Sequence, residues 1–73
     1  MNNTFELIFE VSEEIDGGYN AECLTENIFT QADSWIELRT NVLDAVSAYY
    51  FDKPETKPSI RLHLVKDEVL FAA

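Results

Sequence analysis

The chain has 73 residues, of which 47% are hydrophobic, and its 14 acidic and 5 basic residues give a net charge of −9. Such a length holds a single domain, residues 1–73, with enough apolar material for a core without disulfides or metal. The charge disfavours direct nucleic-acid binding, because the chain repels phosphate. One cysteine excludes an intramolecular disulfide, and no apolar run is long enough to span a membrane. Without a signal-peptide pattern at the start, a cytoplasmic location is expected.

The charge is distributed unevenly along the chain. Residues 1–38 contain nine carboxylates and no Lys or Arg, whereas every basic residue lies at Arg39 or later. This asymmetry favours a basic partner, but excess carboxylate also keeps small domains in solution. Charge alone therefore leaves both interpretations open.

Two segments in the first half alternate apolar and other residues with the period of a half-buried strand, and a third, Ile28-Phe29-Thr30-Gln31, is rich in β-favouring side chains. The strands are expected over about residues 4–12, 19–25 and 28–31. Between the first two, Asp16-Gly17-Gly18 supplies the positive φ angles of a tight hairpin. The first two strands should therefore pair antiparallel. Their inward residues are expected to be Phe5, Leu7, Phe9, Val11, Tyr19, Ala21 and Cys23.

A helix is expected over about residues 35–51. Ser34-Trp35-Ile36-Glu37 matches the S-x-x-E capping box, in which the serine accepts from a first-turn amide and the glutamate reaches back. Trp35 and Phe51, near the two helix ends, are interpreted as core residues rather than partner anchors. The core stripe recurs at spacings of three and four and comprises Trp35, Leu38, Val42, Ala45, Val46 and Tyr49.

Residues 59–65 alternate again and predict a further strand, with Ile60, Leu62 and Leu64 facing inward. The order β-β-β-α-β indicates an α+β two-layer sandwich, in which one helix lies on an antiparallel sheet of three to four strands. The segment from Glu68 to Ala73 is either a short strand or a terminal segment that docks on a neighbour.

One helix covers only one face of such a sheet, so the other face should remain partly open. The residues expected there are Ile8, Leu24, Phe29 and Val65, among carboxylates. Apolar positions on an uncovered sheet often mark a contact surface. A homodimer or higher homo-oligomer is one natural solution.

Few residues could carry catalysis or bind a metal. Only His63 could act as a base for Cys23, and strand parity places these two residues on opposite faces of the sheet. Two Cys or His residues cannot supply the four ligands of a structural zinc site. The acidic residues of the hairpin lack the alternation of a calcium loop, and its glycines are not followed by a phosphate-binding motif. No catalytic residue, cofactor or metal is therefore expected.

Several motifs together resemble the HicB-like antitoxin family, over residues 5–51. In that family a D-G-G-Y-x-A hairpin leads to a short strand ending in T-Q-G, and then to a helix opened by S or T, with E three residues on, that contains N-x-x-[DE]-A. The corresponding segments here are Asp16 to Cys23, Thr30-Gln31-Ala32, Ser34 to Glu37, and Asn41 to Ala45. Ala32 replaces the usual glycine.

The resemblance implies a toxin-neutralising module with a partial double-stranded-RNA-binding-like HicB fold. Its partner would be a small, basic, HicA-like ribonuclease toxin. Full antitoxins often continue into a DNA-binding domain, which is not expected here because the chain stops at Ala73. We interpret Glu13, Glu14, Glu22 and Glu26 as carboxylates that complement the toxin surface. The alternative is an orphan HicB-like protein that acts as a homo-oligomeric scaffold or regulatory subunit without a toxin.

Overall fold

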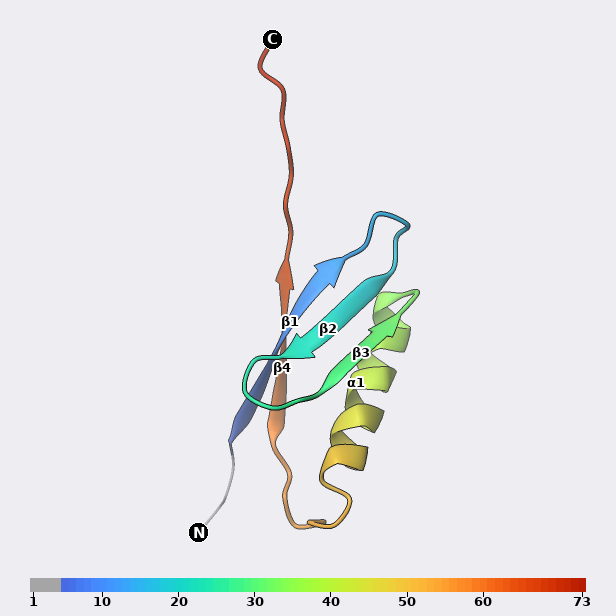
Figure 1. Cartoon of the computed structure of the whole chain (residues 1–73), viewed down its shortest axis with the longest axis vertical. Helices are drawn as coiled ribbons and strands as arrows, with labels where there is room; N and C mark the ends of the chain where they lie inside the picture. The colour runs from blue at the N-terminus through green and yellow to red at the C-terminus, as the bar shows by residue number, and fades with distance from the viewer. Residues whose placement is uncertain (1–4) are drawn as a thin grey trace.

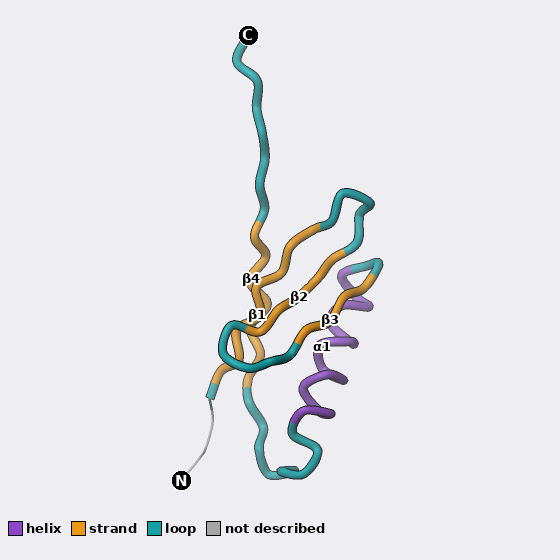
Figure 2. Tube along the Cα trace, viewed as in Figure 1, coloured by secondary structure: helices purple, strands orange, loops and turns teal. Residues whose placement is uncertain are grey.

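The structure is a computed structural model that describes residues 5–73. Its elements are β1 (Glu6–Glu13), β2 (Tyr19–Cys23), β3 (Phe29–Ala32), α1 (Trp35–Tyr49) and β4 (Ser59–Val65). The strands form one sheet, and α1 packs on one face of it, against β2 and β3 (Figures 1 and 2). The predicted α+β two-layer sandwich with the order β-β-β-α-β is therefore confirmed.

The strand ends lie within about two residues of their predicted positions, and β4 agrees with the predicted residues 59–65. The predicted start of the first strand, residue 4, lies outside the described residues. β2 ends at Cys23 instead of residue 25, because the chain turns there. The Cys23 amide donates to the Ile28 carbonyl across this turn at 2.9 Å. β3 is displaced by one residue from the predicted 28–31.

Sheet order is β3-β2-β1-β4, so β1 is an inner strand and β4 forms one edge. β1 pairs antiparallel with β2, and β2 antiparallel with β3. β1 and β4, however, run parallel. The expectation of a wholly antiparallel sheet was therefore wrong for β4. The physical reason is that α1 runs back along the sheet after β3, so the chain reverses direction twice, before and after α1 (Figure 1). β4 therefore runs in the direction of β3 and hence of β1.

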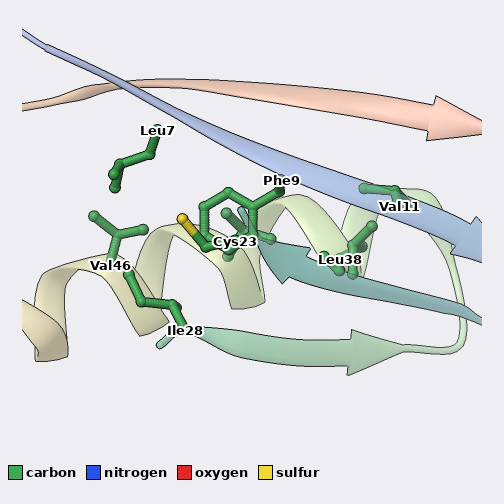
Figure 3. Packing of buried hydrophobic residues seen from close by; sticks show 9 residues of the cluster. Leu7, Phe9, Val11, Cys23, Ile28, Leu38 and Val46 are labelled. Atoms are coloured by element: carbon green, nitrogen blue, oxygen red, sulfur yellow. The ribbon is translucent and has the colours of Figure 1, made fainter. Parts of the chain in front are cut away.

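The core lies between the sheet and α1 (Figure 3). Its buried residues are Leu7, Phe9, Val11, Ala21, Cys23, Ile28, Leu38, Val42 and Val46. Register places Phe9 opposite both Cys23 and Leu62, so these side chains share the face that α1 covers. The predicted inward faces of the first two strands are confirmed at Leu7, Phe9, Val11, Ala21 and Cys23, with Tyr19 partly buried, whereas Phe5 is 40% exposed. Cys23 is a buried free thiol.

Helix α1 begins as predicted and ends earlier. The N-cap Ser34 has extended backbone angles (φ −139°, ψ 162°), and its Oγ accepts from the Glu37 amide at 3.2 Å, the first of the two capping-box bonds. Trp35 packs edge-on against Tyr19, with ring centroids 5.5 Å apart. Phe51 lies beyond the helix end and is 80% exposed, so its assignment to the core was wrong. Among residues 5–73, no helix has the length and apolar character needed to cross a membrane.

Because α1 lies over β2 and β3, it leaves β4 less covered. Ile60 and Leu62 pack half-buried against the core, but Leu64 is 43% exposed. After Val65 the chain continues without secondary structure, in line with β4 and away from the sheet (Figure 1). The end of the chain therefore forms no strand within its own copy.

Candidate partner-binding surface

An acidic hollow of about 410 Å³ lies between the β1–β2 hairpin and the start of α1. The carboxylates that line it are Glu14, Asp16, Asp33 and Glu37. The hairpin is held by its own turn: Gly17 adopts φ +95°, and the Gly18 amide donates to Asp16 Oδ1 at 3.2 Å. A Cβ at Gly18 would lie 3.2 Å from the Ala32 carbonyl oxygen, so glycine permits the close approach of hairpin and β3. The fold thus gathers carboxylates from two distant segments.

Two of the predicted partner-binding residues lie at this end of the sheet. Glu14 lines the hollow, and its Oε1 accepts a hydrogen bond from Asn20 Nδ2 at 3.1 Å. Glu13 is exposed at the end of β1, opposite Tyr19 of β2. Both carboxylates are therefore presented to solvent near the hairpin, where a partner can reach them.

Glu22 lies on the open face of the sheet instead. Register places it opposite Glu10 of β1 on one side and Phe29 of β3 on the other. Two like charges directly opposite on neighbouring strands repel each other. A cation bound at this point would relieve the repulsion.

The open face also carries apolar side chains, as predicted. Leu24 and Phe29 are 56% and 57% exposed, and Val65 is 37% exposed. Ile8 is half-buried, and its carbonyl accepts from the Leu24 amide at 3.0 Å, which sets these two residues side by side. The face thus combines apolar area with carboxylates.

Glu26 lies apart from the other three predicted residues. It sits in the β2–β3 turn, and its Oε2 accepts from the Tyr49 hydroxyl at 2.7 Å. This hydrogen bond is the main reason that the pKa of Tyr49 is raised above its usual value. Glu26 therefore ties the end of α1 to the sheet, and the four predicted carboxylates do not form one patch.

Sequence reasoning did not assign Glu10, Asp33 or Glu37 to the partner-binding surface, although it identified Glu37 as part of the capping box. Strand parity could have found Glu10, because it falls on the same face as Glu22 once the hairpin register is set. The spacing of four between Asp33 and Glu37, around the helix N-cap, placed both near one helix turn. No local sequence pattern indicated that Asp33 and Glu37 lie beside the hairpin.

The carboxylates of this surface form no ion pair within the part of the chain that the structure describes. Among residues 5–73 the structure contains one ion pair, between Glu6 and Arg61 at 3.0 Å. The hydrogen bonds from Arg61 to Glu6 raise the pKa of Arg61. The carboxylates of the hollow and the Glu10–Glu22 pair have no such cation in the described chain. Their negative potential is therefore available to an outside partner.

Cys23 and His63 lie on opposite faces, as strand parity predicted. Cys23 is aligned with the inward Phe9, whereas His63 is exposed and aligned with the outward Glu10. The described chain, residues 5–73, has no group of three or more His, Cys, Asp or Glu arranged to hold a metal. The described surface carries unpaired carboxylates and exposed apolar side chains.

Comparison with known proteins identifies relatives of almost the same length. The chain is 37% identical over 67 residues to a UPF0150 protein of Thermotoga maritima, which covers 92% of this chain and 93% of that protein. It is 45% identical over 53 residues to a UPF0150 protein of Archaeoglobus fulgidus, covering 73% and 79% respectively. No family model matches the chain, and no solved structure matches it significantly. The identity to these two relatives shows that the chain belongs to the UPF0150 family.

Proposed function

We propose that this chain is a HicB-like protein-binding module, the antitoxin-type partner of a small, basic, HicA-like ribonuclease toxin. The partner class rests on the resemblance of the hairpin, the end of β3 and the start of α1 to HicB-like antitoxins. The observation that carries the proposal is the set of unneutralised carboxylates at the hairpin hollow and on the open face.

These carboxylates suit a basic protein surface. Carboxylate oxygens accept paired hydrogen bonds from guanidinium groups, and the hollow of about 410 Å³ has room for such side chains. The net charge of −9 would accelerate the encounter with a basic toxin. Leu24 and Phe29 on the open face would add apolar contact area once the partner is bound.

Association kinetics with a HicA-like toxin encoded in the same genome test the charge mechanism. The variant Glu13→Gln/Glu14→Gln/Glu22→Gln should bind about tenfold more slowly at low salt, with a flatter salt dependence. Glu26 is left intact because it holds Tyr49.

The matched control is Asp44→Asn/Asp52→Asn/Glu55→Gln, which changes the net charge by the same amount at exposed positions elsewhere. It should slow association much less than the first variant. Equal rates for the two variants would show that only overall charge matters and would refute the assigned surface. Absence of binding by the unaltered chain would reject the toxin partner itself.

The orphan alternative is favoured by a different observation, the apolar segment at the end of the chain. Val69, Leu70 and Phe71 are 75%, 80% and 91% exposed, as expected of residues that meet another molecule. Co-purification from the native host, read by mass spectrometry, separates the two functions. A small basic protein in fixed stoichiometry supports the antitoxin, whereas self-association alone supports a homo-oligomeric scaffold or regulatory subunit.

A further inference from the structure

β4 presents a long unpaired edge. It is the terminal strand of the order β3-β2-β1-β4, and it spans seven residues. In the part of the chain that the structure describes, its outer side therefore has backbone N–H and C=O groups without a neighbouring strand. Natural sheets shorten, twist, charge or cover such edges, because an exposed edge pairs readily with another chain.

The face of β4 that points toward the helix layer is also incompletely covered. Leu64 is 43% exposed there, and a second hollow of about 410 Å³ lies beside Ile60. Its apolar lining includes Leu43, Val46, Tyr50, Phe51, Pro58 and Ile60. Lys53 and Lys57 line the same hollow, so it is unsuited to a basic toxin.

The segment from Lys66 to Ala73, which we call the C-terminal segment, has the complementary properties. It continues the direction of β4 and points away from the sheet (Figures 1 and 2). Its Val69, Leu70 and Phe71 are each at least 75% exposed. Because the segment leaves the sheet, its apolar side chains do not join the core of their own copy.

We propose that the C-terminal segment pairs with the outer edge of β4 in a second copy of this chain, and that the exchange is reciprocal. A two-fold axis near Lys66 aligns residues 67–73 of one copy with β4 of the other. The two sheets then become continuous through their β4 strands. An isologous arrangement of this kind closes both exposed edges at once.

The pleat determines which side chains meet. With Lys66 at the axis, Leu70 lies opposite Leu62 on the helix side, and Phe71 lies opposite Arg61 on the open face. Leu70 would thus complete the apolar row of β4 beside the second hollow. At the axis the two Lys66 side chains would lie directly opposite each other and repel, and Glu68 would lie opposite Leu64. Each Lys66 would also lie diagonally across from Glu68 of the other copy, and this attraction opposes the Lys66 repulsion.

Solution mass of the full chain and of one variant tests the association. The unaltered chain should have twice its monomer mass of 8.4 kDa. Leu70→Asp should weaken the dimer at least about tenfold, because it places a charge in the apolar row. Ile36→Asp, a matched change at an exposed residue of α1, should leave the dimer intact. A monomeric full chain, or a dimer unaffected by Leu70→Asp, would overturn the proposal.

Cross-linking tests the register independently of affinity. Leu62→Cys/Leu70→Cys should form a disulfide between copies under mild oxidation, because directly opposed strand residues lie within disulfide reach. Leu62→Cys/Val69→Cys is the control, since Val69 points to the other face. Equal cross-linking of both variants would contradict the assigned pairing. Circular dichroism of each variant verifies that the fold is retained. Neither experiment needs the toxin, so each result is independent of the proposed function.

Discussion

The two edges of the sheet, β3 and β4, differ in how far the chain itself closes them. β3 has four residues, packs under α1, and receives a hydrogen bond from Asn41 Nδ2 to the Gln31 carbonyl at 3.0 Å. β4 has seven residues, has no strand on its outer side in the described chain, and leads into an exposed apolar segment. The comparison teaches that one small helix can protect one edge and its half of the core, which leaves the other edge for intermolecular contact.

The largest expected difference between the helix-covered side and the β4 side is in how much one leucine contributes to the free energy of unfolding. Leu38→Ala, on the fully buried face of α1, should lower the free energy of unfolding by about 2–5 kcal/mol. Leu64→Ala, on β4, should lower it by less than about 1 kcal/mol, because Leu64 is already 43% exposed.

Urea unfolding in the Leu70→Asp background measures both effects without a contribution from association. Leu38→Met, which nearly conserves volume, keeps the comparison measurable if the alanine variant does not fold. Similar losses for Leu38→Ala and Leu64→Ala would mean that β4 belongs to the core as fully as the helix side does.

A smaller effect on stability is expected from loss of the hydrogen bond between Asn41 and the Gln31 carbonyl at the β3 edge. Asn41→Ala removes the donor to the Gln31 carbonyl and should destabilise the protein by about 1 kcal/mol. Hydrogen exchange should speed up in β3 more than in β4, since only the β3 side loses a contact. Asn41→Asp tests the donor specifically, because a carboxylate cannot replace the amide N–H. Unchanged exchange in β3 would show that α1 alone protects this edge.

The smallest effect concerns the Tyr49–Glu26 bond, which fastens the end of α1 on the β3 side. The hydrogen bond to Glu26 raises the pKa of Tyr49, and burial raises that of Tyr50. A raised pKa means that the folded state holds the proton more tightly. The resulting stability is fully present below the unfolded pKa of about 10 and is lost as pH rises through the folded pKa.

Tyr49→Phe should therefore reduce the loss of stability above about pH 10, as measured by urea unfolding at pH 8 and above pH 10. Glu26→Gln should act in the same direction, since it removes the carboxylate that holds the tyrosine proton. A variant that loses as much stability at high pH as the unaltered chain would exclude this coupling.

Much of the fold was predictable because its signals are local. Alternation identified the buried Leu7, Phe9 and Val11, and the N-cap Ser34 fixed the helix start. The parallel direction of β4 was missed, although counting chain reversals after β3 determines it. Phe51 was misassigned because the apolar pattern continues past Tyr49, where the helix ends.

The candidate surface was less predictable because it depends on contacts between distant segments. Glu14 and Glu37 line one hollow only after the hairpin closes onto the start of α1. Glu26 was grouped with the other carboxylates by charge, yet its partner Tyr49 lies 23 residues away. A basic partner therefore stays a prediction from composition, whereas the positions of the carboxylates required the tertiary structure.

The parallel pairing of β1 with β4 also constrains how this chain folds. Glu6 is aligned with Ser59, so the pairing joins segments 53 residues apart (59 − 6), most of the described chain. Closing so long a loop has an entropic cost that precedes any gain from the contacts it brings. The hairpin and helix can form from neighbouring residues, but β1 acquires its second neighbour only when both ends of the domain meet. Because β1 pairs with β4, the first and last strands of the sheet should fold cooperatively.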